Sequence, residues 1–229
     1  MSVAPVVIFD CDGTLLDTEP AYLEAESAIA REHGGVPLAE FVKVVPRLLG
    51  SVPMDCAKLV IEEFKLPITP QQYIDERDER TKNLFPDVGY LPGVERLVEH
   101  LIAHNIPFGI ATSSARKTFE LKMSKRKDWL AKFQVVITGD DVTYGKPHPE
   151  IFEKAARALG TEPGPHCVVF EDAPGGVASG KAAGGMKCVG LRNKFTDDSQ
   201  YHDAKVDVLL NDMTEFVPED FGLPPYHRL

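Results

Sequence analysis

The amino-acid sequence predicts an α/β fold, in which a parallel sheet carries helices on both faces and an all-helical segment is inserted after the first strand. Short apolar runs of strand length alternate with segments of helical periodicity, which is typical of strand–helix–strand units. Between residues 17 and 91 this alternation stops and the apolar spacing is helical throughout. The predicted strands are residues 6–9, 106–111, 135–137, 167–170, 186–189 and 206–210.

Helices of the sheet-bearing part are expected at residues 92–104, 150–159 and 175–183. The first is strongly amphipathic, because its apolar residues recur at i, i+3, i+4, i+7 and i+8 and so share one face. These residues are Val94, Leu97, Val98, Leu101 and Ile102.

The inserted segment begins with a helix that follows Thr18, a suitable N-cap, and reaches about residue 33, with Pro20 in its first turn. Further helices are expected at 51–65 and 70–84. We therefore predict two domains: a core of residues 1–16 and 92–229, and a helical domain of residues 17–91.

The composition is that of an ordinary globular protein of 229 residues, with 43% hydrophobic and 26% charged residues. A net charge of −10 argues against a nucleic-acid partner. With no apolar run long enough to span a bilayer and no signal-like start, we expect no membrane partner, a cytoplasmic location and a monomer. The four scattered cysteines are expected to be reduced, and the basic run 122–127 is interpreted as a solvated helix face.

Polar side chains follow four of the predicted strands, where each strand ends. Asp10 and Asp12 come after the first strand, and Thr112 comes after residues 106–111. Asp140 follows the strand at 135–137, and the pair Glu171-Asp172 follows the strand at 167–170. Because ligands of open parallel sheets bind beyond the carboxyl ends of the strands, these side chains are expected to converge at one edge.

Carboxylates gathered in this way need a compensating cation. Two such charges 4 Å apart repel by about 4 kcal/mol at an effective dielectric constant near 20. Oxygen ligands from few protein groups suit Mg²⁺, and the absence of a His or Cys cluster from the sequence argues against zinc or copper. Lys146, between Gly145 and Pro147, could bring a fixed positive charge to the same edge.

These residues make the chain resemble the haloacid dehalogenase-like (HAD) superfamily of phosphotransferases along nearly its whole length. The resemblance rests on four motifs in order: Asp10-x-Asp12-Gly13-Thr14, Thr112, Lys146 and Glu171-Asp172. It implies a Rossmann-like parallel sheet core with an inserted all-helical cap domain. Within the superfamily the chain is most similar to the group that holds pseudouridine-5′-phosphatase, glycerol-3-phosphate phosphatase and β-phosphoglucomutase.

The resemblance implies a role for each acidic residue. Asp10 would be the nucleophile that forms an aspartyl-phosphate, and Asp12 the acid that protonates the leaving group and then activates water. For that role, neighbouring anions are expected to raise the pKa of Asp12. Mg²⁺ would be held by Asp10, the backbone carbonyl of Asp12 and Asp172, with Glu171 acting through a metal-bound water.

Phosphate oxygens would be bound by Thr112 and Lys146, helped by the backbone N–H groups of Cys11, Asp12 and Ser113. The cap would close over the site and select the substrate. Candidate cap contacts are Glu19, Gly50, Ser51 and Lys82.

The function implied is a Mg²⁺-dependent phosphatase acting on a small phosphorylated metabolite: pseudouridine 5′-phosphate, glycerol phosphate or a sugar phosphate. A phosphomutase is an alternative, but Pro53 stands where the β-phosphoglucomutase pattern has an Arg, and only Lys82 supports it. A further alternative is an inactive phosphate-binding module, which predicts the loss of a motif residue, and none is lost. A dehalogenase is disfavoured because that branch needs neither the acid at Asp12 nor Mg²⁺.

Overall fold

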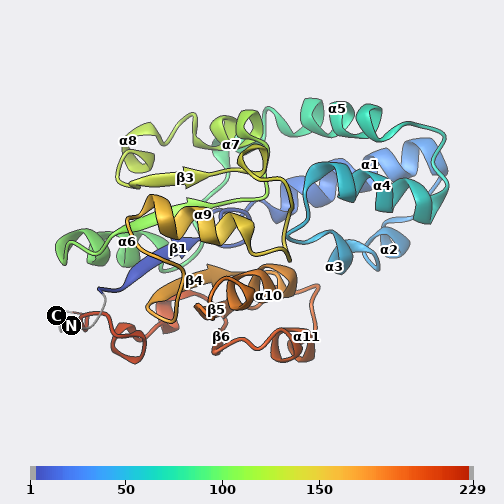
Figure 1. Ribbon diagram of the computed structural model, residues 1–229. Helices are drawn as coiled ribbons and strands as arrows, with labels where there is room; N and C mark the ends of the chain where they lie inside the picture. The colour runs from blue at the N-terminus through green and yellow to red at the C-terminus, as the bar shows by residue number, and fades with distance from the viewer. Residues whose placement is uncertain (1–3, 227–229) are drawn as a thin grey trace.

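The computed structural model describes residues 4–226 and contains a six-stranded sheet with the order β3-β2-β1-β4-β5-β6 (Figure 1). Every neighbouring pair of strands is parallel, so the predicted α/β fold is confirmed. Each predicted strand is present, with ends that differ by at most two residues. The strands are β1 (Val6–Phe9), β2 (Phe108–Ala111), β3 (Val135–Ile137), β4 (Cys167–Glu171), β5 (Lys187–Leu191) and β6 (Val208–Leu210).

The sheet buries both of its faces, and β1 shows this most clearly. Its side chains alternate, so Val7 and Phe9 enter one hydrophobic cluster while Val6 and Ile8 enter another. The first cluster also takes residues from α6 (Val94–Ala103), α7 (Arg116–Met123) and α8 (Lys127–Leu130). The second takes residues from α9 (Glu150–Ala158), α10 (Pro174–Ala182) and α11 (Asp198–Asp203). This two-sided burial explains why the strands are apolar runs without polar alternation.

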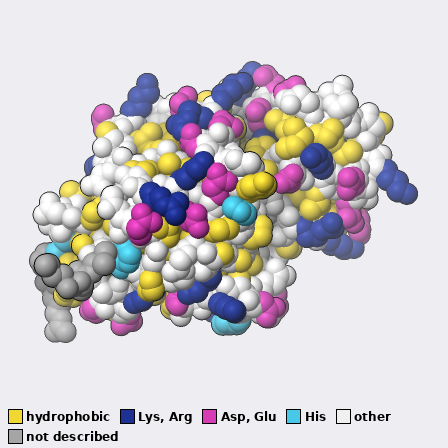
Figure 2. Space-filling view, in the orientation of Figure 1, with side chains coloured by type: hydrophobic (Ala, Val, Ile, Leu, Met, Phe, Trp, Pro, Cys, Tyr) yellow, Lys and Arg dark blue, Asp and Glu magenta, His cyan; other side chains and the backbone are white. Residues whose placement is uncertain are grey.

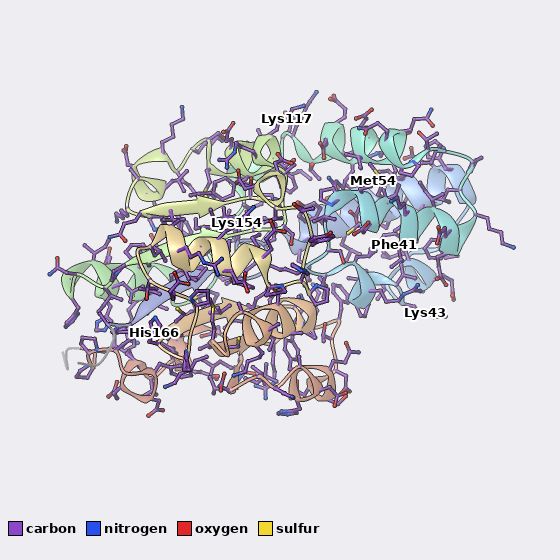
Figure 3. All side chains as sticks on the ribbon, viewed as in Figure 1. Phe41, Lys43, Met54, Lys117, Lys154 and His166 are labelled. Atoms are coloured by element: carbon purple, nitrogen blue, oxygen red, sulfur yellow. The ribbon has the colours of Figure 1, made fainter. Side chains whose placement is uncertain are left out.

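The segment of residues 19–87, between β1 and α6, is helical, and Figure 1 shows it in blue to teal beside the carboxyl ends of the strands. It has a hydrophobic cluster of its own, which includes Ile29, Phe41, Val60 and Tyr73. Figure 3 labels Phe41 within this segment. The elements are α1 (Glu19–Gly34), α2 (Leu38–Phe41), α3 (Val45–Leu48), α4 (Pro53–Phe64), α5 (Pro70–Thr81) and a 3₁₀ turn η1 (Phe85–Asp87). We call these elements the helical insert.

The two chain segments that join the helical insert to the core lie side by side. Leu16 and Tyr90 form an antiparallel bridge, and the backbone N–H of Leu91 donates to the carbonyl of Leu15 at 3.1 Å. The backbone N–H of Asp17 donates to Gly89 at 3.0 Å. The insert therefore leaves and rejoins the core at one place, next to the end of β1.

Four local expectations are tested directly. Thr18 stands at the N-cap of α1, but its hydroxyl caps nothing and bonds Asp12 instead. Ile102 is 42% exposed although the periodicity assigns it to the buried face of α6, because at 100° per residue it falls at the edge of that stripe. The four cysteines are buried and free, as predicted. Among the described residues, no helix combines the length and the apolar character that crossing a bilayer requires.

Figure 2 shows acidic and basic side chains interspersed over one face of the molecule.

The amphipathic face of α6 gives a stability prediction. Leu97→Ala should lower the free energy of unfolding by about 2–5 kcal/mol, because Leu97 is fully buried and its loss leaves a cavity. Glu99→Ala, an exposed position on the same helix, should change it by less than about 0.5 kcal/mol. Urea titrations of both variants measure the difference, and equal stabilities would contradict the assignment of this face to the core.

Candidate active site

The candidate site lies at the carboxyl end of β1, between the ends of its neighbours β2 and β4. The chain order runs in opposite directions on the two sides of β1, which is the point where open α/β sheets bind their ligands. Asp10 directly follows β1, Thr112 follows β2, and Glu171 is the last residue of β4. Three strands thus bring sequence-predicted site residues to one edge of the sheet.

An acidic cluster occupies this edge. Asp10, Glu171 and Asp172 are buried, and each offers a carboxylate oxygen that lies within 4.8 Å of those of the other two. Burial raises the pKa of Asp10 to about 7 despite the opposing charge of Lys146, and the nearby carboxylates add to the rise. Burial, followed by the charges of Glu171 and Asp10, raises the pKa of Asp172 well above its usual value. The three carboxylates therefore repel one another when ionised, and they need a positive charge to compensate them.

The residues around this cluster suit a magnesium ion. The donors are all oxygens, which Mg²⁺ prefers, and they lie close enough for one ion to contact more than one of them. Gly13 has a φ of +73°, and a Cβ there would lie 2.2 Å from Oδ2 of Asp172, so the backbone approaches this carboxylate as only glycine allows. Asn193 donates to the same oxygen at 3.1 Å, and the Tyr201 hydroxyl donates to the Asp172 carbonyl. These two hydrogen bonds together fix the orientation of Asp172.

Lys146 supplies the positive charge that the sequence suggested for this edge. Its Nζ donates to Oδ1 of Asp10 at 2.6 Å, to Oε1 of Glu171 at 2.7 Å and to the Ala111 carbonyl at 3.1 Å. Burial works to lower the pKa of Lys146, but the two carboxylates outweigh it and hold the pKa above its usual value. When Asp10, Glu171 and Asp172 are all ionised, the one ammonium group leaves the cluster net negative, so the ionised cluster favours a bound cation.

Asp12, which is half-buried, belongs to a second group of polar residues around the buried Lys122. Lys122 Nζ donates to its Oδ1 at 2.6 Å and its Oδ2 at 2.8 Å. The hydroxyls of Thr18 and Ser114 donate to the same carboxylate at 2.7 and 2.8 Å. Burial alone would raise the pKa of Asp12, but the charge and hydrogen bonds of Lys122, with those of the two hydroxyls, lower it below its usual value. The expectation that neighbouring anions raise this pKa is therefore wrong, because it did not include Lys122.

Lys122 is the main residue that the sequence interpretation missed. The run 122–127 was expected to be a solvated helix face, yet the Lys122 side chain is fully buried. A signal was available, since on α7 it stands beside Met123 and three residues after Phe119, both of which are buried. Its Nζ also donates to the Tyr22 hydroxyl at 2.8 Å and lies 4.9 Å from the centre of the Phe85 ring. Lys122 thus connects Asp12 to both ends of the helical insert.

The predicted phosphate-binding hydroxyls lie at the end of β2. Thr112 is fully buried, and its Oγ1 accepts from the backbone N–H of Ser114 at 3.1 Å. The N-cap of α7 is Ala115, so Thr112 does not serve as that cap. The Ser113 hydroxyl donates to the Gly50 carbonyl at 2.8 Å and so ties the core to the helical insert.

Backbone donors also converge at this point. In residues 4–226, the N–H groups of Cys11, Asp12 and Ser113 donate to no protein acceptor. Asp12 and Ser113 both line the cavity described next. Such N–H groups can bind the non-bridging oxygens of a phosphate.

A cavity of about 860 Å³, its open mouth included, lies between the sheet edge and the helical insert. The core contributes Asp10, Asp12, Gly13, Ser113, Ser114, Asp172 and Asn193. Most of the remaining wall is apolar and comes from the insert, through Tyr22, Leu23, Phe41, Val45, Leu48, Leu49, Pro53 and Cys56.

The four predicted cap contacts have different positions. Glu19, Gly50 and Ser51 line the cavity. Lys82 is not among the described residues that line it; its side chain is exposed and pairs with Glu79 on the same helical surface. The structure therefore does not place Lys82 at the site.

Two charged residues of the insert that the sequence interpretation missed also line the cavity. Glu26 of α1 and Arg77 of α5 are both buried. Burial raises the pKa of Glu26 to about 7, although the charge of Arg77 opposes the rise. Their positions on two separate helices explain why one sequence gave no sign that they meet.

Comparisons with known proteins agree with this geometry. Residues 4–184 match the family model described as haloacid dehalogenase-like hydrolase. A probable pseudouridine-5′-phosphatase of Drosophila melanogaster is 33% identical, over 96% of this chain and 94% of its own. A (DL)-glycerol-3-phosphatase of Arabidopsis thaliana is 34% identical, over 96% and 92%.

Among solved structures, a HAD hydrolase from Entamoeba histolytica superposes with a TM-score of 0.80 at 25% identity, covering 95% of this chain and 97% of its own. The family match extends from the first strand through the acidic motif at the end of β4 and includes the whole helical insert. This protein belongs to the haloacid dehalogenase-like hydrolase family.

Proposed function

We propose that this protein is a Mg²⁺-dependent phosphatase that hydrolyses a small phosphorylated metabolite through an aspartyl-phosphate intermediate. The observation that carries the proposal is the position of Asp10: its buried carboxylate faces the cavity within the acidic cluster and is bonded to Lys146. The phosphatase names of the two curated relatives support the same reaction class.

Asp10 is the nucleophile in this proposal. Lys146 binds its Oδ1, while Oδ2 accepts no hydrogen bond from the described residues, which leaves that oxygen able to attack phosphorus. Attack in line with the ester oxygen forms the Asp10–phosphate bond and breaks the bond to the leaving alkoxide. Thr112, Ser113 and Lys146, with the backbone N–H groups of Cys11 and Asp12, bind the non-bridging oxygens.

Asp12 exchanges protons with the leaving group and with water. With its pKa held low by Lys122, this carboxylate is ready to take a proton from the water that hydrolyses the aspartyl-phosphate. To donate a proton to the leaving alkoxide, Asp12 must first gain one when the phosphate dianion enters, because a nearby negative charge raises the pKa of a carboxylate.

The metal site of the proposal uses the carboxylates of Asp10 and Asp172 and the backbone carbonyl of Asp12, with Glu171 acting through water. Mg²⁺, when bound, would screen the phosphate charge from Asp10 and so permit attack by an anion on an anion.

Residues 17–91 act as a cap in this proposal, with residues 1–16 and 92–229 as the catalytic core. A separate hydrophobic cluster in the insert and the paired connections at Leu16 and Tyr90 support the division. The insert supplies most of the cavity wall away from the carboxylates, so it would select the leaving group. Pseudouridine 5′-phosphate, glycerol phosphate and sugar phosphates are the candidates.

The alternatives have less support. A mutase needs a cation for a second phosphate, but Pro53 lines the cavity where the mutase pattern has an Arg, and Lys82 is exposed and is not among the described residues that line it. Arg77 is the one cation of the insert on this cavity wall within the described residues, and it is already flanked by Glu26 and Asp78. An inactive binding module would not need to keep both Asp10 and Asp12 on the cavity wall.

The mutase alternative has a direct test. Incubation with β-glucose 1-phosphate and a bisphosphate activator should release free phosphate faster than it forms glucose 6-phosphate, because the one cation of the insert among the described lining residues is already flanked by two acids. Faster formation of glucose 6-phosphate would favour the mutase.

Asp10→Asn should lower kcat for p-nitrophenyl phosphate by about 10⁴-fold or more, because it removes the nucleophilic charge and keeps the shape. Asp128→Asn, the same change at an exposed position of α8, should leave activity unchanged. Circular dichroism checks that both variants are folded. Appreciable turnover by a folded Asp10→Asn variant would exclude covalent catalysis by Asp10.

Chelation by EDTA should abolish activity, and added Mg²⁺ should restore it. Mg²⁺ should also raise the melting temperature, because it binds the folded acidic cluster and not the unfolded chain. Asp172→Asn should raise the Mg²⁺ concentration for half-maximal activity by about tenfold or more, while Asp128→Asn should not. Full activity in EDTA would rule out the proposed metal site. An unchanged Mg²⁺ concentration for half-maximal activity in the Asp172→Asn variant would rule it out as well.

A further inference from the structure

A second set of polar side chains lines the cavity at a distance from the carboxylate cluster. On α1, Glu19, Tyr22, Leu23 and Glu26 all line the cavity, because their spacing puts them on one helical face. Thr18, at the start of this helix, bonds Asp12, and Glu26 lies about 12 Å further along the helix axis at 1.5 Å per residue. Glu26 is therefore at the end of the cavity that a substrate's leaving group would occupy.

Glu26 and Arg77 lie next to each other at this end of the cavity but form no hydrogen bond with each other. Arg77 Nη1 is 3.8 Å from Oε1 of Glu26, which exceeds hydrogen-bond length. Glu26 accepts no hydrogen bond from the described residues, and Nε of Arg77 is buried without a partner. A buried ion pair that only stabilised the fold would need closer geometry and satisfied donors, because unpaired buried polar groups are costly. Both side chains thus have spare hydrogen-bonding capacity.

The charges at this end favour a neutral group. Arg77 Nη2 already donates to Oδ1 of Asp78 at 3.0 Å, and Glu26 lies on its other side. A second phosphate or a carboxylate placed here would meet two acids and one guanidinium. A neutral group with an acceptor for Arg77 and an adjacent donor for Glu26 meets no such repulsion.

The walls between the two ends favour a flat ring over a polyol. Leu23, Phe41, Val45 and Leu48 of the helical insert line the cavity, and the Arg77 guanidinium lies 5.6 Å from the centre of the Tyr22 ring. The hydroxyls of glycerol or a simple sugar would lose their water against this apolar surface without gaining partners. A planar heterocycle would bury apolar faces and present polar atoms only at its edge.

We propose that Arg77 and Glu26 recognise the edge of a planar base at which a ring carbonyl stands beside a ring N–H, as in uracil, so that the preferred substrate is the 5′-phosphate of such a ribonucleoside. Arg77 donates to the ring carbonyl oxygen and Glu26 accepts from the adjacent ring N–H. Because the phosphate end is the site described above, this inference rests on the proposed phosphatase function. It adds that the base, and not only the phosphate, determines selection.

Kinetics with three substrates test this assignment. The wild type should have a higher kcat/KM for pseudouridine 5′-phosphate than for ribose 5-phosphate or glycerol 3-phosphate. Arg77→Met should lower kcat/KM for pseudouridine 5′-phosphate at least tenfold more than for ribose 5-phosphate. Arg80→Met is the matched control, since Arg80 is on the same helix, pairs with Glu32 and does not line the cavity. It should preserve the wild-type preference.

The chemistry at Glu26 and at the substrate gives two further readouts. Glu26→Leu should reduce the preference for the base, whereas Glu26→Gln, which keeps a carbonyl acceptor, should retain more of it. Methylation of the imide nitrogen should lower kcat/KM of pseudouridine 5′-phosphate with the wild type, a comparison that needs no folded variant. Equal losses for all substrates in Arg77→Met, or no effect of N-methylation, would overturn the proposal.

Measurements of ligand binding distinguish a failure of this proposal from a failure of the phosphatase function. If the wild type releases no phosphate even from p-nitrophenyl phosphate, the proposed function fails. Calorimetry with pseudouridine 5′-phosphate and the Asp10→Asn variant then still decides the recognition site. The assignment is supported if this variant binds pseudouridine 5′-phosphate more tightly than ribose 5-phosphate and loses this preference when Arg77→Met is added. Equal binding of both ligands rejects it.

Discussion

The burial of acidic side chains at the carboxyl ends of β1 and β4 is the constraint on which the rest of the site depends. Asp10, Glu171 and Asp172 repel one another, and Lys146 offsets only part of their charge. The surrounding contacts hold these groups in place, through the glycine at position 13 and the hydrogen bond from Asn193. Three close carboxylate oxygens with one ammonium group form a set of donors that could hold a metal ion.

The buried Lys122 links Asp12 to the helical insert. Lys122 bonds Asp12 and Tyr22 at once and lies against the ring of Phe85. Tyr22 belongs to the first helix of the insert and Phe85 to its last turn, so one ammonium group connects the carboxylate to both ends of the insert. The position of the insert and the electrostatics of Asp12 are thereby coupled through direct contacts.

Much of the fold follows from local sequence. The strands that bury both faces of the sheet are continuous apolar runs, and the amphipathic helices follow from spacing, as α6 illustrates. The short helices α2 and α3 were not predicted, because four residues carry too little periodicity for the spacing to be recognised. Ile102 shows the same limit at the edge of an apolar stripe.

For the site, the sequence by itself determined which carboxylates follow strands, because a parallel sheet brings all strand ends to one edge, and it indicated that Lys146 could reach that edge from a loop. Only the tertiary structure decided that Lys122 lies beside Asp12 and that Glu26 meets Arg77 in the cavity. These pairs join residues about 110 and 51 positions apart. The physical reason is that a side chain's partners across helices depend on how the helices pack, which no local pattern of residues specifies.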